Sequence, residues 1–99
     1  MPVNVYSTNS FDRVAKKLHA KDKKVLDLAV SAVAKNRLIG EGKKGDLAGV
    51  FVYKFKLNHQ QTLLAYTMQP NKLKPVAVTL LYVGPHENFY ATLKRSTAR

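Results

Sequence analysis

A glycine-rich stretch in the first half of the chain has the spacing of a phosphate-binding loop. The sequence GEGKKGD, residues 40–46, fits the pattern G-x-G-x-x-G and places Lys43 and Lys44 between glycines. Such loops bind a dinucleotide when a strand precedes them and a helix follows them. Here a helical pattern precedes the loop and a strand pattern follows it. We therefore predict a helix-to-strand connection, from which Lys43 and Lys44 can reach a nucleic-acid backbone, and no nucleotide cofactor.

Other catalytic and metal-binding patterns are absent from the sequence. The chain has no cysteine, and its three histidines, His19, His59 and His86, lie far apart in sequence. The segment HENFY lacks the second histidine of H-E-x-x-H, and there is no G-x-S-x-G. We expect no bound metal and no cofactor.

The net charge indicates a polyanionic partner. Seventeen Lys and Arg residues stand against six Asp and Glu residues, which gives a formal charge of +11. A domain of 99 residues needs far fewer charges for solubility, so this surplus favours nucleic acid, an acidic protein, or both. Beyond residue 47 the only acid is Glu87, so the second half is the better candidate for an anion-binding surface.

The first part of the chain predicts a short edge strand and two helices. Residues 3–7 alternate between apolar and polar side chains, as in a strand. Ser10 is the expected N-cap of a first helix, whose apolar stripe is Phe11, Val14, Ala15 and Leu18. A second helix is predicted with the stripe Val25, Leu28, Ala29, Ala32 and Val33. The brief turn between them predicts an antiparallel helical hairpin over one hydrophobic surface.

From residue 47 the period becomes two. Residues 50–57 predict a strand with Phe51, Tyr53, Phe55 and Leu57 on one face and Val52, Lys54 and Lys56 on the other. Two more strands follow, and the last, VAVTLLYV, is apolar on both faces and so is predicted to be central. A short helical pattern ends the chain. The fold class is therefore α+β: an edge strand, a helical hairpin packed on an antiparallel sheet, and a short C-terminal helix. No stretch could span a membrane and no signal peptide is visible, so we expect a soluble cytoplasmic protein.

Three segments, taken in order, resemble the RelE/ParE superfamily of type II toxins. They are KKGDLAGVFVYKFK, LLAY and LLYVGPHENFYATLKR. The most specific parts are Gly45 to Leu47, the strand with Tyr66, and the ending GPHENFY, which is similar to that of the YafQ-type ribosome-dependent mRNA interferases. The resemblance implies one toxin domain over residues 1–99, bound by a cognate acidic antitoxin.

The resemblance implies one of two activities. The RelE and YafQ branches cut mRNA on the ribosome, whereas the ParE branch poisons DNA gyrase. Cleavage with the ribose 2′-hydroxyl as nucleophile needs proton transfer and cations that stabilise the charged phosphorus centre. For this chemistry we assign as catalytic His86, Lys54, Lys56, Tyr90 and Arg95. The residues assigned to nucleic-acid binding are Lys43, Lys44, Lys72, Lys74 and Lys94.

The chain departs from the family pattern on the strand that leads to Tyr66. Many family members carry an arginine three residues before this tyrosine, where the chain has Leu63. The YafQ branch has a His and an Asp on the same approach, where Leu57 and Gln61 stand here, with His59 out of register. The missing arginine motivates the gyrase-poisoning alternative. A basic nucleic-acid-binding module without toxicity is a third interpretation.

Overall fold

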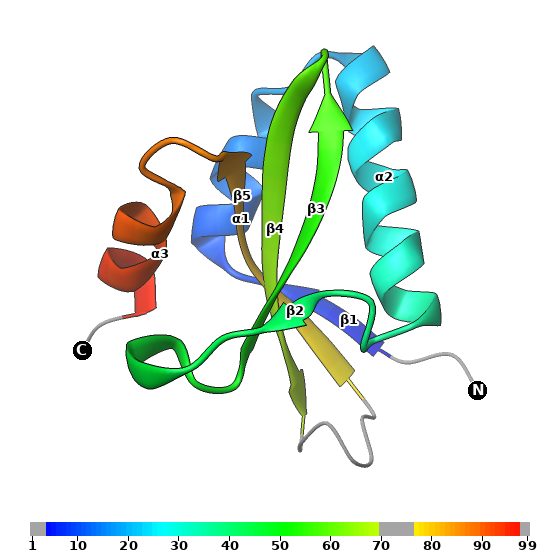
Figure 1. Cartoon of the computed structure of the whole chain (residues 1–99). Helices are drawn as coiled ribbons and strands as arrows, with labels where there is room; N and C mark the ends of the chain where they lie inside the picture. Colours follow the sequence, from blue (N-terminus) through cyan, green and yellow to red (C-terminus); the bar gives the residue numbers. More distant parts are fainter. Residues whose placement is uncertain (1–3, 70–76, 98–99) are drawn as a thin grey trace.

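A five-stranded sheet forms the centre of the molecule (Figure 1). The structure, a computed structural model, describes residues 4–69 and 77–97. The strand order is β1-β5-β4-β3-β2, and the strands are β1 (Asn4–Ser7), β2 (Glu41–Gly42), β3 (Val50–Leu57), β4 (Gln60–Gln69) and β5 (Ala77–Pro85). The helices are α1 (Asn9–Lys16), α2 (Ala20–Lys35) and α3 (Phe89–Thr97). The predicted α+β element order is confirmed.

The strand pairing confirms the edge strand and the meander. β3, β4 and β5 pair antiparallel in sequence order, and β1 pairs with β5 in parallel, so the sheet is mixed. β5 lies inside the sheet, but the middle strand is β4. The β3–β4 turn is made by Asn58 and His59, whose φ angles of 54° and 64° are those of a two-residue hairpin of the tight I′ type.

The cap of α1 differs from the prediction. Thr8, and not Ser10, is the N-cap, because its hydroxyl accepts a hydrogen bond from the Phe11 N–H at 3.2 Å. The same hydroxyl donates to the carbonyl of Leu81 at 2.7 Å, so the cap also attaches the helix to β5. Ser, Thr, Asp and Asn all favour this position. The contact with β5 selects among the candidates, and it is not visible in the local sequence.

The buried stripe of α2 is also displaced from the predicted one. Of the predicted stripe, Ala29 and Val33 are buried, whereas Leu28 is 71% exposed. Asp22 and Leu26 are buried in addition. Both lines of residues have helical spacing, and packing on the sheet selects between them. The carboxylate of Asp22 is buried but paired, since Asn58 in the β3–β4 turn donates to it at 2.9 Å.

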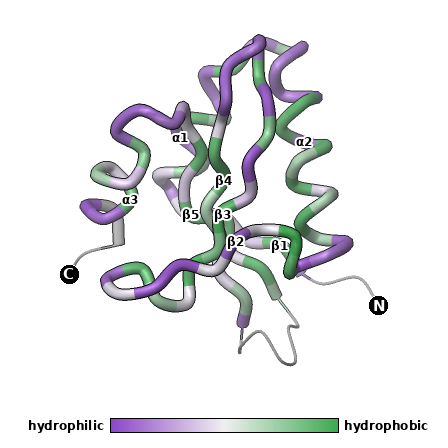
Figure 2. The backbone as a smooth tube through the Cα atoms, viewed as in Figure 1, coloured by the Kyte–Doolittle hydropathy of each residue, from purple (hydrophilic) through white to green (hydrophobic). Residues whose placement is uncertain are grey.

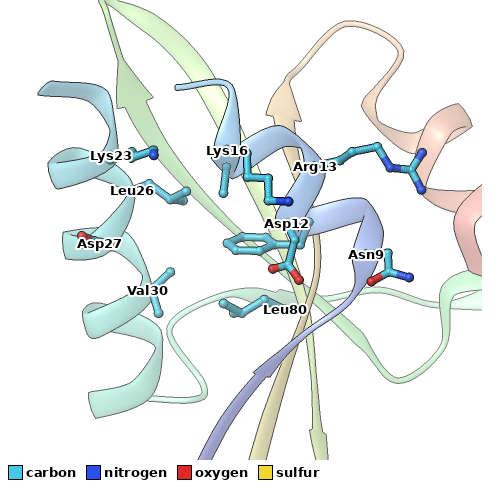
Figure 3. Close-up of a pocket in the computed structure, with 11 residues that line it drawn as sticks. Asn9, Asp12, Arg13, Lys16, Lys23, Leu26, Asp27, Val30 and Leu80 are labelled. Carbon is cyan, nitrogen blue, oxygen red and sulfur yellow. The ribbon is translucent and has the colours of Figure 1, made fainter. Parts of the chain in front are cut away.

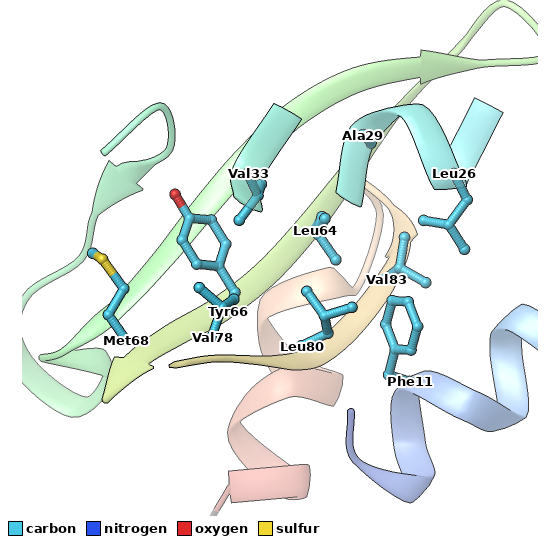
Figure 4. Close-up of a cluster of buried hydrophobic side chains, with 10 residues drawn as sticks. All are labelled: Phe11, Leu26, Ala29, Val33, Leu64, Tyr66, Met68, Val78, Leu80 and Val83. Atoms are coloured by element: carbon cyan, nitrogen blue, oxygen red, sulfur yellow. The ribbon is translucent and has the colours of Figure 1, made fainter. Parts of the chain in front are cut away.

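The two faces of the sheet carry separate hydrophobic clusters. One face, which we call the hairpin face, is covered by the helical hairpin of α1 and α2. The cluster beneath these helices includes Phe11, Leu26, Val33, Leu64 and Tyr66 (Figure 4). On the opposite face, which we call the α3 face, the C-terminal helix packs on Val52, Leu63 and Ala65. Figure 1 shows α2 and α3 on opposite sides of the strands. Hydrophilic residues gather near the turn that joins β3 and β4, beyond the part of the sheet that α3 covers (Figure 2).

Candidate active site

The alternation of β3 places two lysines on the α3 face. Phe51, Tyr53 and Phe55 pack against the cluster under α1 and α2, as predicted. Val52 belongs to the cluster under α3, and Lys54 and Lys56 continue the same face as exposed residues. This face therefore changes along one strand from a hydrophobic surface to a cationic one.

The glycine-rich connection is fixed to the edge of β3. Glu41 and Gly42 form β2, paired with Val52 and Phe51, and the Lys43 N–H donates to the Val50 carbonyl at 2.9 Å. The prediction of a helix-to-strand connection is confirmed. The two-residue strand and the turn at Gly45–Leu47 add order that the glycine content did not indicate.

Gly40 is required by a close contact. The Tyr66 hydroxyl accepts a hydrogen bond from the Gly40 N–H at 2.9 Å and donates to the Arg37 carbonyl at 2.8 Å. A Cβ on residue 40 would lie 2.6 Å from that hydroxyl oxygen, so only glycine fits without a shift. Burial raises the pKa of Tyr66, which keeps the hydroxyl neutral. Tyr66 is therefore a structural clamp under the connection.

Lys43 links this connection to α3. Its ammonium lies 2.8 Å from a carboxylate oxygen of Glu41 and 5.2 Å from the centre of the Tyr90 ring. The hydrogen bond to Glu41 is the main cause that raises the pKa of Lys43. The pKa of Glu41 is lowered by the hydrogen bond and charge of Lys43 and, more weakly, by Lys54. Lys43 and Lys54 thus keep the Glu41 carboxylate ionised, and Lys43 also contacts the Tyr90 ring.

Glu41 was missed by the sequence interpretation. Its position depends on the pairing of β2 with β3. A strand of two residues leaves no periodic pattern in the sequence from which this pairing could be predicted. The usable signal was the Glu-x-Lys spacing, because residues two apart in an extended segment share a face.

The segment after β5 presents His86 and Tyr90. The His86 N–H donates to the Gln61 carbonyl at 3.3 Å, which ties the segment to β4. Phe89 and Leu93 are buried on the sheet and anchor α3. Tyr90 then meets His86 edge to face, with ring centres 6.5 Å apart. The imidazole itself makes no hydrogen bond to any other described residue, and its side chain is exposed.

The ladder brings His86 close to the lysines of β3. Gln61 on β4 pairs with Lys56 on β3. The carbonyl of Gln61 accepts a hydrogen bond from the His86 N–H, on the side of β4 away from β3. The backbone of His86 is thus about two strand spacings, about 10 Å measured across the strands, from the backbone of Lys56. Lys54 pairs with Leu63, which is fully buried under α3. The α3 face therefore carries this group of five residues: contacts link Lys43 to Tyr90 and Tyr90 to His86, while Lys54 and Lys56 follow Val52 along β3.

The remaining predicted residues lie outside this group. Arg95 donates to the Thr92 hydroxyl at 3.4 Å and lies farther along α3 than Tyr90. Lys94 approaches Asp46 at 3.8 Å, and Lys44 is exposed in the connection. Lys72 and Lys74 lie outside the described residues.

A separate groove lies between α1 and α2 (Figure 3). Its volume is about 690 Å³, and apolar side chains line it together with charged ones, among them Phe11, Leu26, Val30, Asp12 and Lys23. None of the residues assigned to catalysis lines it. Among residues 4–69 and 77–97, no three His, Asp or Glu side chains gather as a metal site, and no helix is long and apolar enough to cross a membrane.

Comparisons with solved structures show what the fold is similar to. The toxin–antitoxin complex RelBE2 of Mycobacterium tuberculosis matches with a TM-score of 0.68 at 22% identity, covering 86% of this chain and 99% of that one. A doubly substituted E. coli RelE toxin in the free state matches with a TM-score of 0.68 at 19% identity, covering 95% and 94%. The intact E. coli RelBE complex matches with a TM-score of 0.65 at 20% identity, covering 86% and 98%. At these identities the likeness is one of fold.

The sequence itself matches a family as well. No curated protein matches the chain. A family model described as the ParE-like toxin of type II bacterial toxin–antitoxin systems matches residues 5–94. The superfamily resemblance is thereby confirmed, while the YafQ-like interpretation of GPHENFY stays a prediction. The match spans nearly the whole chain, and the chain belongs to the ParE-like toxins of type II toxin–antitoxin systems.

Proposed function

We propose that this toxin is a ribosome-dependent endoribonuclease that cuts mRNA. The observation that carries the proposal is that the α3 face carries His86, Tyr90 and Lys43, linked by side-chain contacts, together with Lys54 and Lys56 on β3. Phosphoryl transfer from RNA needs a proton-transfer group next to concentrated positive charge, and this group of residues offers both. The RelE-like fold of the structural relatives fits the same chemistry.

Each residue has a distinct part in the proposed reaction. The ribose 2′-hydroxyl loses its proton to water as its oxygen attacks the adjacent phosphorus, the bond from phosphorus to the 5′-oxygen breaks, and that oxygen takes a proton from His86. Histidine suits this step because its type changes charge near neutral pH. Lys54 and Lys56 stabilise the negative charge that develops on the phosphate oxygens. Glu41 is a poor proton acceptor because its pKa is lowered, so its part is to hold Lys43 against Tyr90.

Induced expression followed by primer extension on cellular mRNAs tests the proposal. We expect discrete cuts in translated frames soon after induction, and none in a reporter mRNA whose start codon has been removed. Intact mRNA in cells whose growth has stopped would contradict the proposal.

The gyrase-poisoning alternative has its own support. Leu63 stands where many members of the RelE/ParE superfamily carry an arginine, and it is fully buried under α3. This position of β4 therefore supplies no arginine near the lysines of β3. The matching family is described as ParE-like. Double-strand breaks in DNA together with intact mRNA in the same induced cells would favour this alternative.

We also propose that an acidic antitoxin covers the Lys54 and Lys56 end of the α3 face. The charge of +11 supports this partner, and several structural relatives are toxin–antitoxin complexes. A complementary chain relieves the repulsion among the cations while it blocks the site. Association of the two proteins should slow, and their affinity should fall, as salt rises. An association rate independent of salt would contradict this partner surface.

A further inference from the structure

A second basic pocket lies between α1 and α3, apart from the proposed active site. Its volume is about 190 Å³, and its lining is Ser10, Arg13, Val14, Lys17, Tyr82 and Thr92. None of these six residues belongs to the group around His86 and Lys54. Figure 3 shows the Arg13 side chain extending from α1 toward α3. We call this hollow the α1–α3 pocket.

The pocket has positive charge without a counter-ion. Arg13 and Lys17 are four residues apart, in the last turn and at the C-cap of α1, so they lie on one side of the helix. Neither forms an ion pair with a described residue, and no acidic side chain lines the pocket. Asp12, next to Arg13 in sequence, accepts a hydrogen bond from Ser7 at 2.6 Å and lines the groove between α1 and α2, which Arg13 also borders. Two unneutralised cations beside one hollow favour an anion there.

Arg95 adds a third cation to this side of α3. Its guanidinium donates to the hydroxyl of Thr92, and Thr92 lines the pocket. The sequence interpretation assigned Arg95 to catalysis together with His86, but its described contact is with Thr92, which lines the α1–α3 pocket. Arg95 therefore lies next to the pocket lining without being part of it.

The pocket suits a phosphate group on a larger molecule. Complete small-molecule sites occupy about 300–1,000 Å³, so a hollow of about 190 Å³ holds a part of a ligand. The guanidinium and ammonium groups supply donors for phosphate oxygens. The hydroxyls of Tyr82 and Thr92 both donate and accept, which matches a ribose 2′-hydroxyl as well as a phosphate.

An acidic protein segment fits less well. Such a segment gains much of its affinity from apolar side chains, and Val14 is the one aliphatic side chain in the lining. The groove between α1 and α2, with Phe11, Leu26 and Val30, offers that surface instead.

We propose that the α1–α3 pocket binds a backbone phosphate of RNA and is a second RNA-binding site, separate from the cleavage site. Arg13 and Lys17 bind the phosphate. Arg95, which is hydrogen-bonded to Thr92, adds positive charge near the pocket. The choice of RNA as ligand depends on the function proposed above. The anion site itself depends only on the geometry and charge of the pocket.

The test compares two charge-matched double variants. Arg13→Gln/Lys17→Gln removes the pocket cations but keeps much of their aliphatic length. Lys24→Gln/Lys35→Gln removes the same charge from α2, on the other side of the molecule from α3. Affinity for a short single-stranded RNA is measured by fluorescence anisotropy at several salt concentrations. The pocket variant should lower the slope of log affinity against log salt by about 1.4, because each cation that no longer binds a phosphate removes about 0.7. The α2 variant should lower it much less.

A second measurement locates the anion. Inorganic phosphate added to isotope-labelled protein should shift the amide NMR signals of Arg13, Lys17 and Thr92, and the pocket variant should abolish these shifts. Equal slope changes in the two double variants, or phosphate shifts that avoid the pocket, would overturn the proposal. So would a glutamate-rich peptide that displaces RNA from the pocket at lower concentration than phosphate. If the parent protein shifts at the pocket but cuts no mRNA, the cleavage function fails and the anion site stands.

Discussion

The two faces of the sheet are built from the same strands but end differently. On the hairpin face, β3 keeps aromatic residues along its length, and α1 and α2 cover them. On the α3 face, the same strand changes from valine at residues 50 and 52 to lysine at 54 and 56, where the cover of α3 ends. On the hairpin face, every second residue of β3 from Phe51 to Phe55 is aromatic, as packing against the helices requires. Under the function proposed above, the change to lysine on the α3 face supplies cations to the site.

The largest expected effect is on the chemistry of the α3 face. His86→Ala should lower ribosome-bound mRNA cutting by about 10²–10⁴-fold, the usual contribution of a proton-transfer group. The melting temperature should stay the same, because the imidazole makes no hydrogen bond to another described residue. Cutting in extracts and thermal melting measure the two effects.

The matched control for this histidine is His19→Ala, at the N-cap of α2, the helix on the face of the sheet opposite α3. His19 is exposed, and its side chain makes no capping hydrogen bond. Both activity and stability should be retained. Growth arrest by His86→Ala equal to that of the parent, at equal protein level, would refute the histidine mechanism and favour the gyrase alternative.

Two neighbouring leucines on β4 compare the faces directly. Leu64 points into the cluster under α1 and α2 and Leu63 into the cluster under α3, and both are fully buried. Truncation of a buried leucine costs about 2–5 kcal/mol in the free energy of unfolding, depending on how far the surroundings collapse. Leu64→Ala should fall at the upper end, because two helices and the sheet enclose it. Leu63→Ala should fall at the lower end, because only the short α3 covers it.

Urea unfolding of both variants measures this difference. A greater loss of stability for Leu63→Ala than for Leu64→Ala would show that α3 is the more firmly packed cover. Leu63 also pairs with Lys54, so its truncation should reduce mRNA cutting more than the loss of stability explains.

The sequence predicted much of the fold because its patterns are local. The change of period at residue 47 and the alternation of β3 placed Phe51, Tyr53 and Phe55 on one face and both lysines on the other, as observed. The errors came where a long-range contact selects between equal local solutions. Thr8 replaces Ser10 as the cap because its hydroxyl also reaches β5.

The candidate site divides in the same way. His86, Tyr90 and the two strand lysines could be named from residue type and spacing, but their grouping depends on the pairing of β3, β4 and the segment after β5. The environment of Glu41 and the direction of Arg95 needed side-chain contacts, and neither has a local sequence signature. Charge alone could not separate Lys43, which binds Glu41 and faces Tyr90, from the exposed Lys44.

Tyr66→Phe should have a smaller effect, on the hairpin face. The loss of its hydroxyl leaves the Arg37 carbonyl and the Gly40 N–H without this partner, at a cost of about 1–3 kcal/mol in stability. Urea unfolding checks the cost, with Tyr6→Phe on the exposed β1 as the control. An unchanged free energy of unfolding would mean that water replaces the hydroxyl at no cost.

The charge of the α3 face should appear in RNA binding. Lys54→Ala and Lys56→Ala should each lower the slope of log affinity against log salt by about 0.7, the contribution of one phosphate contact to single-stranded RNA. Anisotropy titrations on a short RNA measure the slope. Lys24→Ala, on the outer side of α2, is the control of equal charge. A fall of the same size in the control would assign the effect to net charge and not to position.

The smallest expected effect concerns Glu41, whose carboxylate pairs with Lys43. Glu41→Gln should raise RNA affinity a few-fold, because it frees the Lys43 ammonium and removes a negative charge from the face. The pKa of Glu41 is lowered from its ordinary 4.5, so the ion pair is complete at neutral pH and is lost only as pH falls through that lowered value. The affinity difference between parent and variant should therefore be constant from about pH 6 to 8 and disappear in acid. Anisotropy titrations across pH check this, and Glu87→Gln removes the same charge from outside the pair. A gain in affinity from Glu87→Gln as large as that from Glu41→Gln would mean that the carboxylate acts by its charge alone and not by holding Lys43.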